Sequence, residues 1–196
     1  MIITNDIYKK KLNNYGNKNT KLSRDVKTKE LYRIINGVYE TNPNTPGYLL
    51  AGSIYGPSYI SFDYALSFYG MIPERVTTIT CATNSKKKIK EYNTMFGVFT
   101  FRDVPVLAYP EELILKVEGE YSYQIATKEK ALCDKLYILS PLKNYTELEN
   151  MLFNDLRIDR DEFNKLDKIK IEKLGELYHS SNVKLLSKYI RRNINE

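Results

Sequence analysis

The chain has 196 residues, of which 42% are hydrophobic and 28% are charged. These fractions are close to the averages for globular proteins, so they exclude a mainly disordered chain and a membrane protein. No apolar run approaches the ~20 residues that a membrane-spanning helix needs, and the amino-terminal residues lack the pattern of a signal peptide. The composition therefore predicts a folded cytoplasmic protein without a membrane partner.

The net charge of +6 is concentrated at the amino-terminal end of the chain. Residues 1–38 carry nine basic and three acidic side chains, whereas the other residues carry 21 of each sign. We expect such a distribution when the basic segment faces a polyanion such as nucleic acid. The alternative is a solvated, lysine-rich terminus in a protein that is rich in Lys, Asn and Ile.

Cysteine, histidine and acidic residues show no pattern of a metal or catalytic site. Cys81 and Cys133 each lie in apolar sequence without a second cysteine nearby, so we expect two buried free thiols. The single histidine, His179, has no other Cys or His at metal-ligand spacing. A glycine-rich phosphate loop and a carboxylate cluster at metal spacing are also missing. The sequence therefore predicts no metal, no cofactor and no catalytic residue.

Two short helices are predicted at the amino terminus. Thr4 or Asn5 can cap a first helix over residues 5–15. After a turn, Asn19 or Thr20 can cap a second helix that ends before the next β-prone run. A helix, a turn and a second helix are thus expected within the basic segment.

The second helix is predicted to present a polar, basic face to solvent. Leu22 and Val26 lie four residues apart and point inward, so the other side chains occupy the outer arc. Short polar side chains near the start of this helix suit base edges, and the flanking lysines suit phosphates. The candidate DNA-binding residues are Lys18, Asn19, Thr20, Lys21, Ser23, Arg24, Lys27 and Arg33.

A hairpin is predicted directly after the second helix. Residues 31–35 and 38–40 are β-prone, and Asn36-Gly37 between them predicts a type I′ turn, in which both central residues have positive φ. A basic helix followed by such a hairpin is typical of a winged helix-turn-helix, with Arg33 reaching a phosphate or the minor groove. The alternative is a small helical cap whose lysines are merely solvated.

The turn-forming residues 42–47 separate the basic module from the rest of the chain. We expect an abbreviated winged helix-turn-helix domain over residues 1–43. A mixed α/β domain is expected over residues 44–141, and its helical carboxy-terminal part over residues 142–196. The predicted fold class is therefore α+β.

The central region mixes predicted helices and strands. Ser61 and Thr127 are placed to cap its two helices, and Gly70 is placed to close the first of them with a positive φ. The expected helices cover residues 62–69 and 128–139, and the expected strands cover residues 76–81, 97–102 and 121–125.

A lysine run forms a second candidate basic patch between two of these strands. It consists of Lys86, Lys87, Lys88 and Lys90. Contact with nucleic acid or with a partner is one interpretation of this patch. A solubilising loop is the other, because lysine side chains are mostly exposed whether or not they bind anything.

The pattern becomes helical from residue 144 onward. Thr146 and the acidic residues after it resemble a capping box, so a helix is expected to open there. Positive and negative charges nearly balance in this region, which suits packing or protein contacts better than DNA. Further helices are expected over residues 159–167, 169–179 and 182–193.

Four segments carry a recognisable order of motifs: residues 19–39, 59–74, 76–83 and 125–134. In this order they resemble the AbiEi antitoxins of type IV toxin–antitoxin systems, first recognised in phage abortive infection. The segments look like the family's shortened winged helix, its Ser-Ala-Leu helix that closes on Gly, its central strand and its Ala-Thr-x-Glu-Lys-Ala-Leu helix. The resemblance covers nearly the whole chain, although the amino-terminal module is shorter than in longer members.

The resemblance implies a transcriptional repressor that binds inverted repeats of double-stranded DNA upstream of its own operon. It also implies that the carboxy-terminal part counteracts a cognate nucleotidyltransferase toxin, directly or functionally. A monomer in solution would then place two copies on the two repeats. The family's DNA contacts carry over to Thr20, Lys21, Ser23, Arg24 and Arg33.

Other functions remain open at this stage. The chain could be a winged-helix regulator without a toxin, or an enzyme that modifies its toxin. An RNA-binding or purely protein-binding module is a further alternative, because the 17 tyrosines could offer stacking surfaces. Most of them fall at apolar positions, however, where packing in the core is the expected use.

Overall fold

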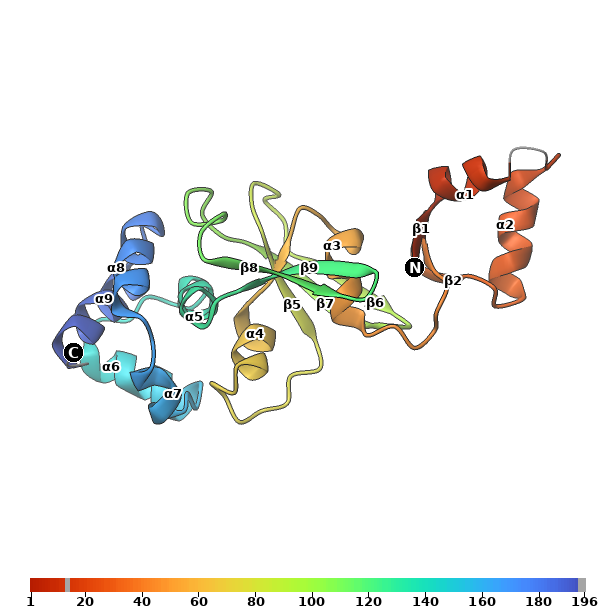
Figure 1. The fold of residues 1–196 in the computed structure, drawn as a ribbon. Coiled ribbons are helices and arrows are strands. Elements are labelled where there is room, and N and C mark those ends of the chain that lie inside the picture. The colour runs from red at the N-terminus through yellow and green to blue at the C-terminus, as the bar shows by residue number, and fades with distance from the viewer. Residues whose placement is uncertain (13–14, 194–196) are drawn as a thin grey trace.

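The computed structural model describes residues 1–12 and 15–193. Its helices and strands form an α+β structure with two sheets, as predicted. Figure 1 shows three parts in a row: a small amino-terminal module, a central sheet and a group of carboxy-terminal helices. Within the described residues, no helix has the length and apolar character that crossing a membrane requires.

The amino-terminal module contains two helices and a small antiparallel sheet. The strand order is β1-β3-β2. The first strand is not predicted from the sequence, because three residues are too few to show an alternating pattern. The elements are β1 (Ile2–Thr4), α1 (Asn5–Lys11), α2 (Lys18–Lys27), β2 (Tyr32–Ile35) and β3 (Val38–Glu40).

The caps of the two helices differ in part from the prediction. Thr4 caps α1 as expected, but the helix ends at Lys11, and residues 13–14 of the predicted helix lie outside the described residues. Asn17 caps α2, because its side chain accepts a hydrogen bond of 3.1 Å from the N–H of Thr20. The predicted caps two and three residues later are therefore wrong, and those residues form the first turn.

The predicted hairpin is present as β2 and β3, but its turn is not of type I′. Only Gly37 has a positive φ, of 84°, whereas type I′ requires positive φ at Asn36 as well. The pairing also shifts between Arg33 and Ile35. This irregularity changes how the strands enter the turn, which the dipeptide alone does not reveal.

The module has a small hydrophobic core of its own and meets the central part through both apolar and polar contacts. Ile34 of β2 is buried in the main hydrophobic core of the chain, and further apolar side chains of the small sheet pack against that core. The amino group of Met1 donates hydrogen bonds to Glu40 at 2.5 Å and to the hydroxyl of Tyr121 at 2.8 Å. Thr45 also lies 3.3 Å from that hydroxyl. The buried core residues of the module are Ile3, Tyr8, Leu22, Leu31 and Tyr39.

The central sheet is mixed and has the strand order β6-β7-β5-β4-β9-β8. The pairs β5–β7 and β4–β9 are parallel, and the other neighbours are antiparallel. Its strands are β4 (Tyr59–Ile60), β5 (Ile79–Thr83), β6 (Lys90–Thr94), β7 (Gly97–Asp103), β8 (Leu113–Glu118) and β9 (Tyr121–Ala126).

The strand predictions were incomplete both at the sheet centre, where the two-residue strand β4 was missed, and at its edges. β7 and β9 match the prediction closely, whereas β5 begins three residues later than predicted. Both edge strands, β6 and β8, are missing from the prediction. An edge strand buries few side chains, so its sequence need not alternate between apolar and polar residues.

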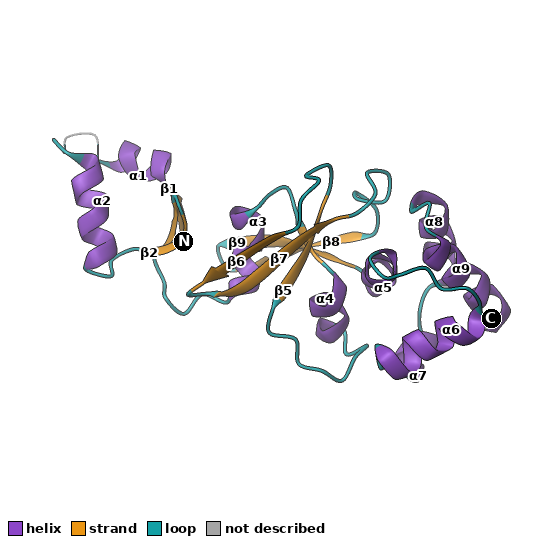
Figure 2. Ribbon diagram, turned by 180° about the vertical axis from the view of Figure 1, so that it is seen from behind, coloured by secondary structure: helices purple, strands orange, loops and turns teal. Residues whose placement is uncertain are grey.

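Helix α5 connects the central sheet to the carboxy-terminal helices. Figure 2 shows α5 lying between the central sheet and helices α8 and α9. A 3-10 helix over Gly47–Leu50 precedes α3, and a π-helical turn over Met151–Asp155 follows α6. The α-helices are α3 (Ala51–Ile54), α4 (Phe62–Phe68), α5 (Lys128–Tyr137), α6 (Tyr145–Asn150), α7 (Arg160–Asn164), α8 (Lys168–Leu177) and α9 (Ser181–Asn193).

The amino-terminal caps of these helices agree only in part with the prediction. Thr127 caps α5 as predicted, and Gly70 follows α4 with a φ of 68°. Ser61 stands at the amino-terminal end of α4, but its hydroxyl makes no capping bond. Asn144, not Thr146, caps α6, because the helix begins one residue before the predicted capping box.

The hydroxyl of Ser61 instead joins a buried polar network around Asp134. Asp134 accepts hydrogen bonds from Ser61 at 2.6 Å, from Tyr59 at 3.0 Å and from Tyr178. Lys130 lies one helical turn away, with its Nζ 3.4 Å from Asp134 and 2.7 Å from the Tyr178 hydroxyl. The same Nζ donates to the carbonyl oxygen of Ala108 at 2.6 Å. The network thus connects α5 to β4, to α8 and to the loop after β7.

Burial opposes the charge of Lys130 and the ionisation of the tyrosines. Both side chains of the Lys130–Asp134 pair are 0% exposed. Desolvation lowers the pKa of Lys130, although the negative charge of Asp134 acts in the opposite direction. Desolvation and then Asp134 raise the pKa values of Tyr59 and Tyr178 well above 10. The tyrosines therefore stay neutral donors, and Lys130 depends on Asp134 for its charge.

We predict that Asp134→Ala lowers the free energy of unfolding by about 3–5 kcal/mol, because Lys130 would remain buried without its counter-ion. Urea denaturation followed by circular dichroism measures this change. Asp63→Ala is the matched control, since Asp63 pairs with Lys135 at 2.8 Å but is 33% exposed, and its loss should cost about 0.2–1 kcal/mol. Equal losses in the two variants would contradict the prediction.

Candidate nucleic-acid interface

Helix α2 lies at the outer end of the molecule, on the far side of its module from the central sheet (Figure 1). Leu22 is buried and Val26 is half-buried, as the helical spacing predicts. The opposite face is open to solvent. Its exposed side chains are Asn19, Thr20, Ser23, Arg24 and Lys27.

Lys21 differs from these neighbours because it is held inside the module. Its Nζ lies 2.5 Å from Oδ1 of Asp25 and 3.8 Å from Glu30, and its side chain is only 19% exposed. The hydroxyl of Tyr8 on α1 donates to the other oxygen of Asp25. The hydrogen bond between Tyr8 and Asp25 joins α1 to α2, and Lys21 supplies the counter-ion of Asp25 within α2. Lys21 therefore has a structural role in addition to any contact with a ligand.

The buried carboxylate of Asp25 is stabilised in its charged form. Desolvation raises its pKa, but hydrogen bonds from Lys21 and Tyr8 outweigh that effect and hold the pKa below the ordinary value. The sequence offers one signal for this pair, the i,i+4 spacing of Lys21 and Asp25. The spacing does not reveal that Asp25 faces inward.

Arg24 is exposed and oriented by an aromatic neighbour. Its Nη2 donates a hydrogen bond of 3.0 Å to the hydroxyl of Tyr15. Tyr15 lies in the turn between the two helices and is 43% exposed. This contact restrains a long side chain at the surface while leaving other guanidinium N–H groups available as donors.

A basic hollow lies beside the start of α2. It has a volume of about 350 Å³ and is lined by Asp6, Lys9, Lys10 and Lys18. Lys9 and Lys10 belong to the last turn of α1 and contribute to the counted charge excess, but the sequence assigns them no site. Only the turn between the helices brings these lysines next to Lys18. An anion could be held there by three ammonium groups.

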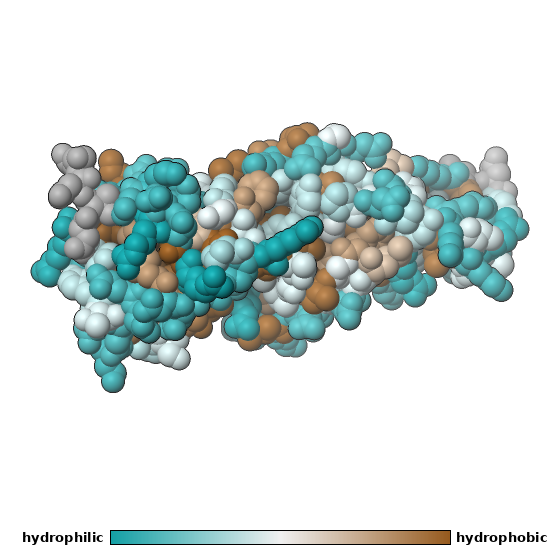
Figure 3. Space-filling model, turned by 90° about the horizontal axis from the view of Figure 1, so that it is seen from below, coloured by the Kyte–Doolittle hydropathy of each residue, from teal (hydrophilic) through white to brown (hydrophobic). Residues whose placement is uncertain are grey.

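Arg33 is exposed on β2, which lies on the side of the module that faces the central sheet (Figure 1). The structure therefore brings most of the predicted residues together on α2, but it does not gather Arg33 with them. Figure 3 shows that the end of the molecule formed by this module is mainly hydrophilic on the face in view, whereas apolar surface lies over the middle.

The second candidate patch is divided in the structure. The Nζ of Lys86 donates to the carbonyl oxygen of Gly56 at 3.0 Å, and Lys90 begins β6. Lys87 and Lys88 are exposed and line a shallow hollow of about 340 Å³ together with Arg102. This patch lies on the central sheet, apart from α2.

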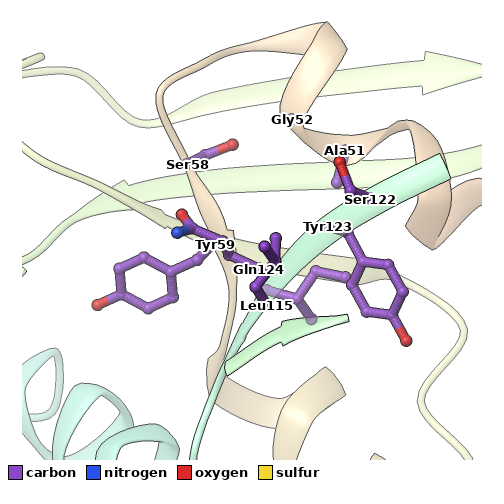
Figure 4. Close-up of a pocket in the computed structure, with 9 residues that line it drawn as sticks. Ala51, Gly52, Ser58, Tyr59, Leu115, Ser122, Tyr123 and Gln124 are labelled. Carbon is purple, nitrogen blue, oxygen red and sulfur yellow. The ribbon is translucent and has the colours of Figure 1, made fainter. Parts of the chain in front are cut away.

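A separate hollow of about 270 Å³ lies between α3 and β9 (Figure 4). Its polar side chains include Ser58, Ser122 and Gln124, and the Ser58 hydroxyl is buried without a hydrogen-bond partner. Hydroxyl and amide groups can bind by hydrogen bonds but do not transfer protons readily near neutral pH. Across residues 1–12 and 15–193, no three His, Cys, Asp or Glu side chains gather as metal ligands.

Cys81 and Cys133 are free and fully buried, as predicted, and desolvation raises the pKa of both thiols. Buried thiols of this kind are unreactive.

No family model matches the sequence, and no curated protein matches it either. The likeness to AbiEi antitoxins therefore stays a prediction.

We predict that the amino-terminal module loses stability in acid through Asp25. Because the pKa of Asp25 is lower in the folded than in the unfolded state, its contribution is complete above the unfolded value of about 3.9 and is lost as the pH falls below it. Hydrogen exchange of α2 amides as a function of pH measures this loss. Asp25→Asn should weaken protection at neutral pH and reduce its further loss in acid, and an unchanged acid profile would contradict the assignment.

Proposed function

We propose that this chain is a DNA-binding antitoxin. Residues 1–43 would bind inverted repeats in the promoter of its own operon, and the remaining residues would counteract a nucleotidyltransferase toxin. The observation that carries the proposal is the position of the charge excess. The excess falls on residues 1–38, within a module that has a small core of its own and whose outermost helix exposes a polar and basic face.

The element order of the module supports α2 as the recognition helix. A strand, two helices and a hairpin follow one another, and the first strand pairs with the last. This order supports the proposal of an abbreviated winged helix-turn-helix over residues 1–43. In such domains the second helix of the pair enters the major groove and reads base edges with its amino-terminal residues.

The side chains of α2 divide into three roles under this proposal. Asn19, Thr20 and Ser23 are short, exposed and close to the start of the helix, where they suit base edges. Arg24 suits guanine, because a guanidinium can donate two parallel hydrogen bonds to it. Lys27 suits a phosphate on one side of the groove.

The basic hollow supplies a second phosphate position. Lys9, Lys10 and Lys18 surround it next to the amino-terminal end of α2, where the helix dipole also favours an anion. Phosphate contacts on both sides of the helix would hold α2 in the groove. Two copies of the chain would then occupy the two halves of an inverted repeat, in the cytoplasm where the promoter is found.

The antitoxin part of the proposal is supported by how the other resembling segments meet. Ser61 and Asp134, from the second and fourth segments, share a hydrogen bond of 2.6 Å. Thr80, from the third, donates to the carbonyl oxygen of Ser61 at 2.5 Å. These three segments therefore meet within one fold, as expected if they belong to a single antitoxin domain.

We predict that Lys27→Ala weakens binding to all DNA sequences and reduces the salt dependence of log K by about one unit, as expected for a phosphate contact. Arg24→Ala should instead cost about 1–3 kcal/mol on the chain's own promoter and reduce its preference over unrelated duplexes. Gel shifts at several salt concentrations measure both effects. Lys184→Ala is the control, since this exposed lysine lies on α9 at the opposite end of the molecule. Equal effects at all three positions would contradict the interface.

We predict that the double variant Arg24→Ala/Lys27→Ala still protects cells from the toxin encoded beside the chain's gene. The physical reason is that neither residue contributes to the main hydrophobic core. Growth after co-expression of toxin and variant from an unrelated promoter is the measurement. Loss of protection, with the variant folded, would show that DNA binding and neutralisation share one surface.

A further inference from the structure

The edge strand β8 exposes apolar side chains next to an unpaired backbone. β8 pairs with β9 on one side, and no strand among the described residues pairs with its other side. Leu115 is 64% exposed and Val117 is 70% exposed. In an edge strand, alternate N–H and C=O groups also point outward without a partner. β8 therefore offers both the hydrogen bonds and the apolar surface that a further strand would use.

The two edges of the central sheet differ in how they are protected. β6 has the sequence Lys-Glu-Tyr-Asn-Thr, whose charged and polar residues discourage pairing with another chain. β8 has the sequence Leu-Ile-Leu-Lys-Val-Glu, with only Lys116 and Glu118 charged. An unprotected apolar edge in a native protein indicates a surface that is covered in function.

Lys116 and Glu118 have no ion-pair partner within the part of the chain that the structure describes. The Nζ of Lys116 lies 4.6 Å from the centre of the Phe68 ring. The carboxylate of Glu118 accepts two hydrogen bonds, both from neutral hydroxyl groups: from Tyr48 at 2.7 Å and from Tyr123 at 2.8 Å. Each charge is thus oriented but has no direct ion pair, although Lys116 helps to lower the pKa of Glu118 after the hydrogen bonds from Tyr48 and Tyr123. An ion pair is available to a partner that presents the opposite charges at the same spacing.

We propose that β8 pairs antiparallel with β8 of a second copy of this chain, about a two-fold axis that passes through Val117. In this register Lys116 of each copy lies opposite Glu118 of the other, and the two Val117 residues face one another. Directly opposite unlike charges stabilise a strand pair, whereas like charges destabilise it. The dimer would satisfy both unpaired charges at once and would cover the exposed valine.

Other two-fold registers are less favourable for electrostatic reasons. An axis through Lys116 places the two lysines opposite each other. An axis through Leu115 gives a longer overlap, but it leaves Lys116 against Ile114. It also gives Glu118 no cation, because the residue opposite it is Glu112. An axis through Ile114 places Lys116 opposite Glu112 of the other copy, but Glu112 already pairs with Lys170 at 2.8 Å. Only the register centred on Val117 pairs unlike charges that both belong to β8.

This self-association does not depend on DNA, so it stands or falls separately from the proposed function. Its symmetry is nevertheless compatible with that function, because a two-fold dimer matches an inverted repeat. The strand pair alone buries a small area, so we expect a weak dimer whose population rises with protein concentration.

Cysteine cross-linking tests the register. Directly opposite residues have Cα atoms about 4.5–5.5 Å apart, within the range that a disulfide spans. Val117→Cys should therefore form a covalent dimer under mild oxidation. In Leu115→Cys the new thiol faces Gly119 of the other copy. The introduced thiols of the two copies then lie about 13 Å apart, so no covalent dimer should form. Cys81 and Cys133 are fully buried and do not interfere. Equal cross-linking of both variants, or none, would overturn the proposal.

Charge reversal tests whether the partner of β8 is a second copy of this chain. Lys116→Glu and Glu118→Lys should each be monomeric, because each variant opposes like charges twice. An equimolar mixture should associate again, since unlike charges then meet at every position of the mixed dimer. Sedimentation velocity over a range of concentrations measures this, with circular dichroism as the check on folding. A wild-type chain that stays monomeric at every concentration, or a mixture that fails to associate, would overturn the proposal even if β8 binds another protein.

Discussion

The charge of Lys130, enclosed in the main core, is the constraint on which the central structure depends. A buried ammonium group is costly unless a counter-ion and hydrogen-bond acceptors surround it. Asp134 supplies the counter-ion from the same helix, and Tyr178 and Ala108 supply acceptors from α8 and from the loop after β7. Tyr59 then brings β4 to the same carboxylate. One group of polar contacts therefore joins α5, the sheet centre and the carboxy-terminal helices inside the main hydrophobic core.

The amino-terminal module follows the same principle on a smaller scale. Asp25 is buried, and Lys21 and Tyr8 compensate its charge from α2 and α1. This contact joins α1 and α2 on the inner side of α2, so the opposite face of α2 is left open to solvent. A lysine that the sequence offers for DNA binding thus orients its neighbours, while Arg24 and Lys27 remain at the surface.

The module and the central part are joined by apolar and polar contacts. Ile34 packs into the main hydrophobic core, and Glu40 and Tyr121 bind the amino terminus, while the charge excess stays on one side of that junction. The central part carries balanced charge, an enclosed polar network and an open sheet edge at β8. Such features suit contacts with proteins, whereas the module suits a polyanion.

The sequence by itself determined the features that depend on neighbours along the chain. It predicted the hairpin at Asn36-Gly37, the Thr127 cap, the inward Leu22 and the basic segment, because turn, cap and helix periodicity are local. Only the tertiary structure decided the edge strands, the hollow beside α2 and the partners of Asp134. These depend on residues far apart in sequence, and a lysine that is buried has the same local pattern as one that is exposed. The role of Lys130 therefore became visible only once the strands, helices and loop around it were in place.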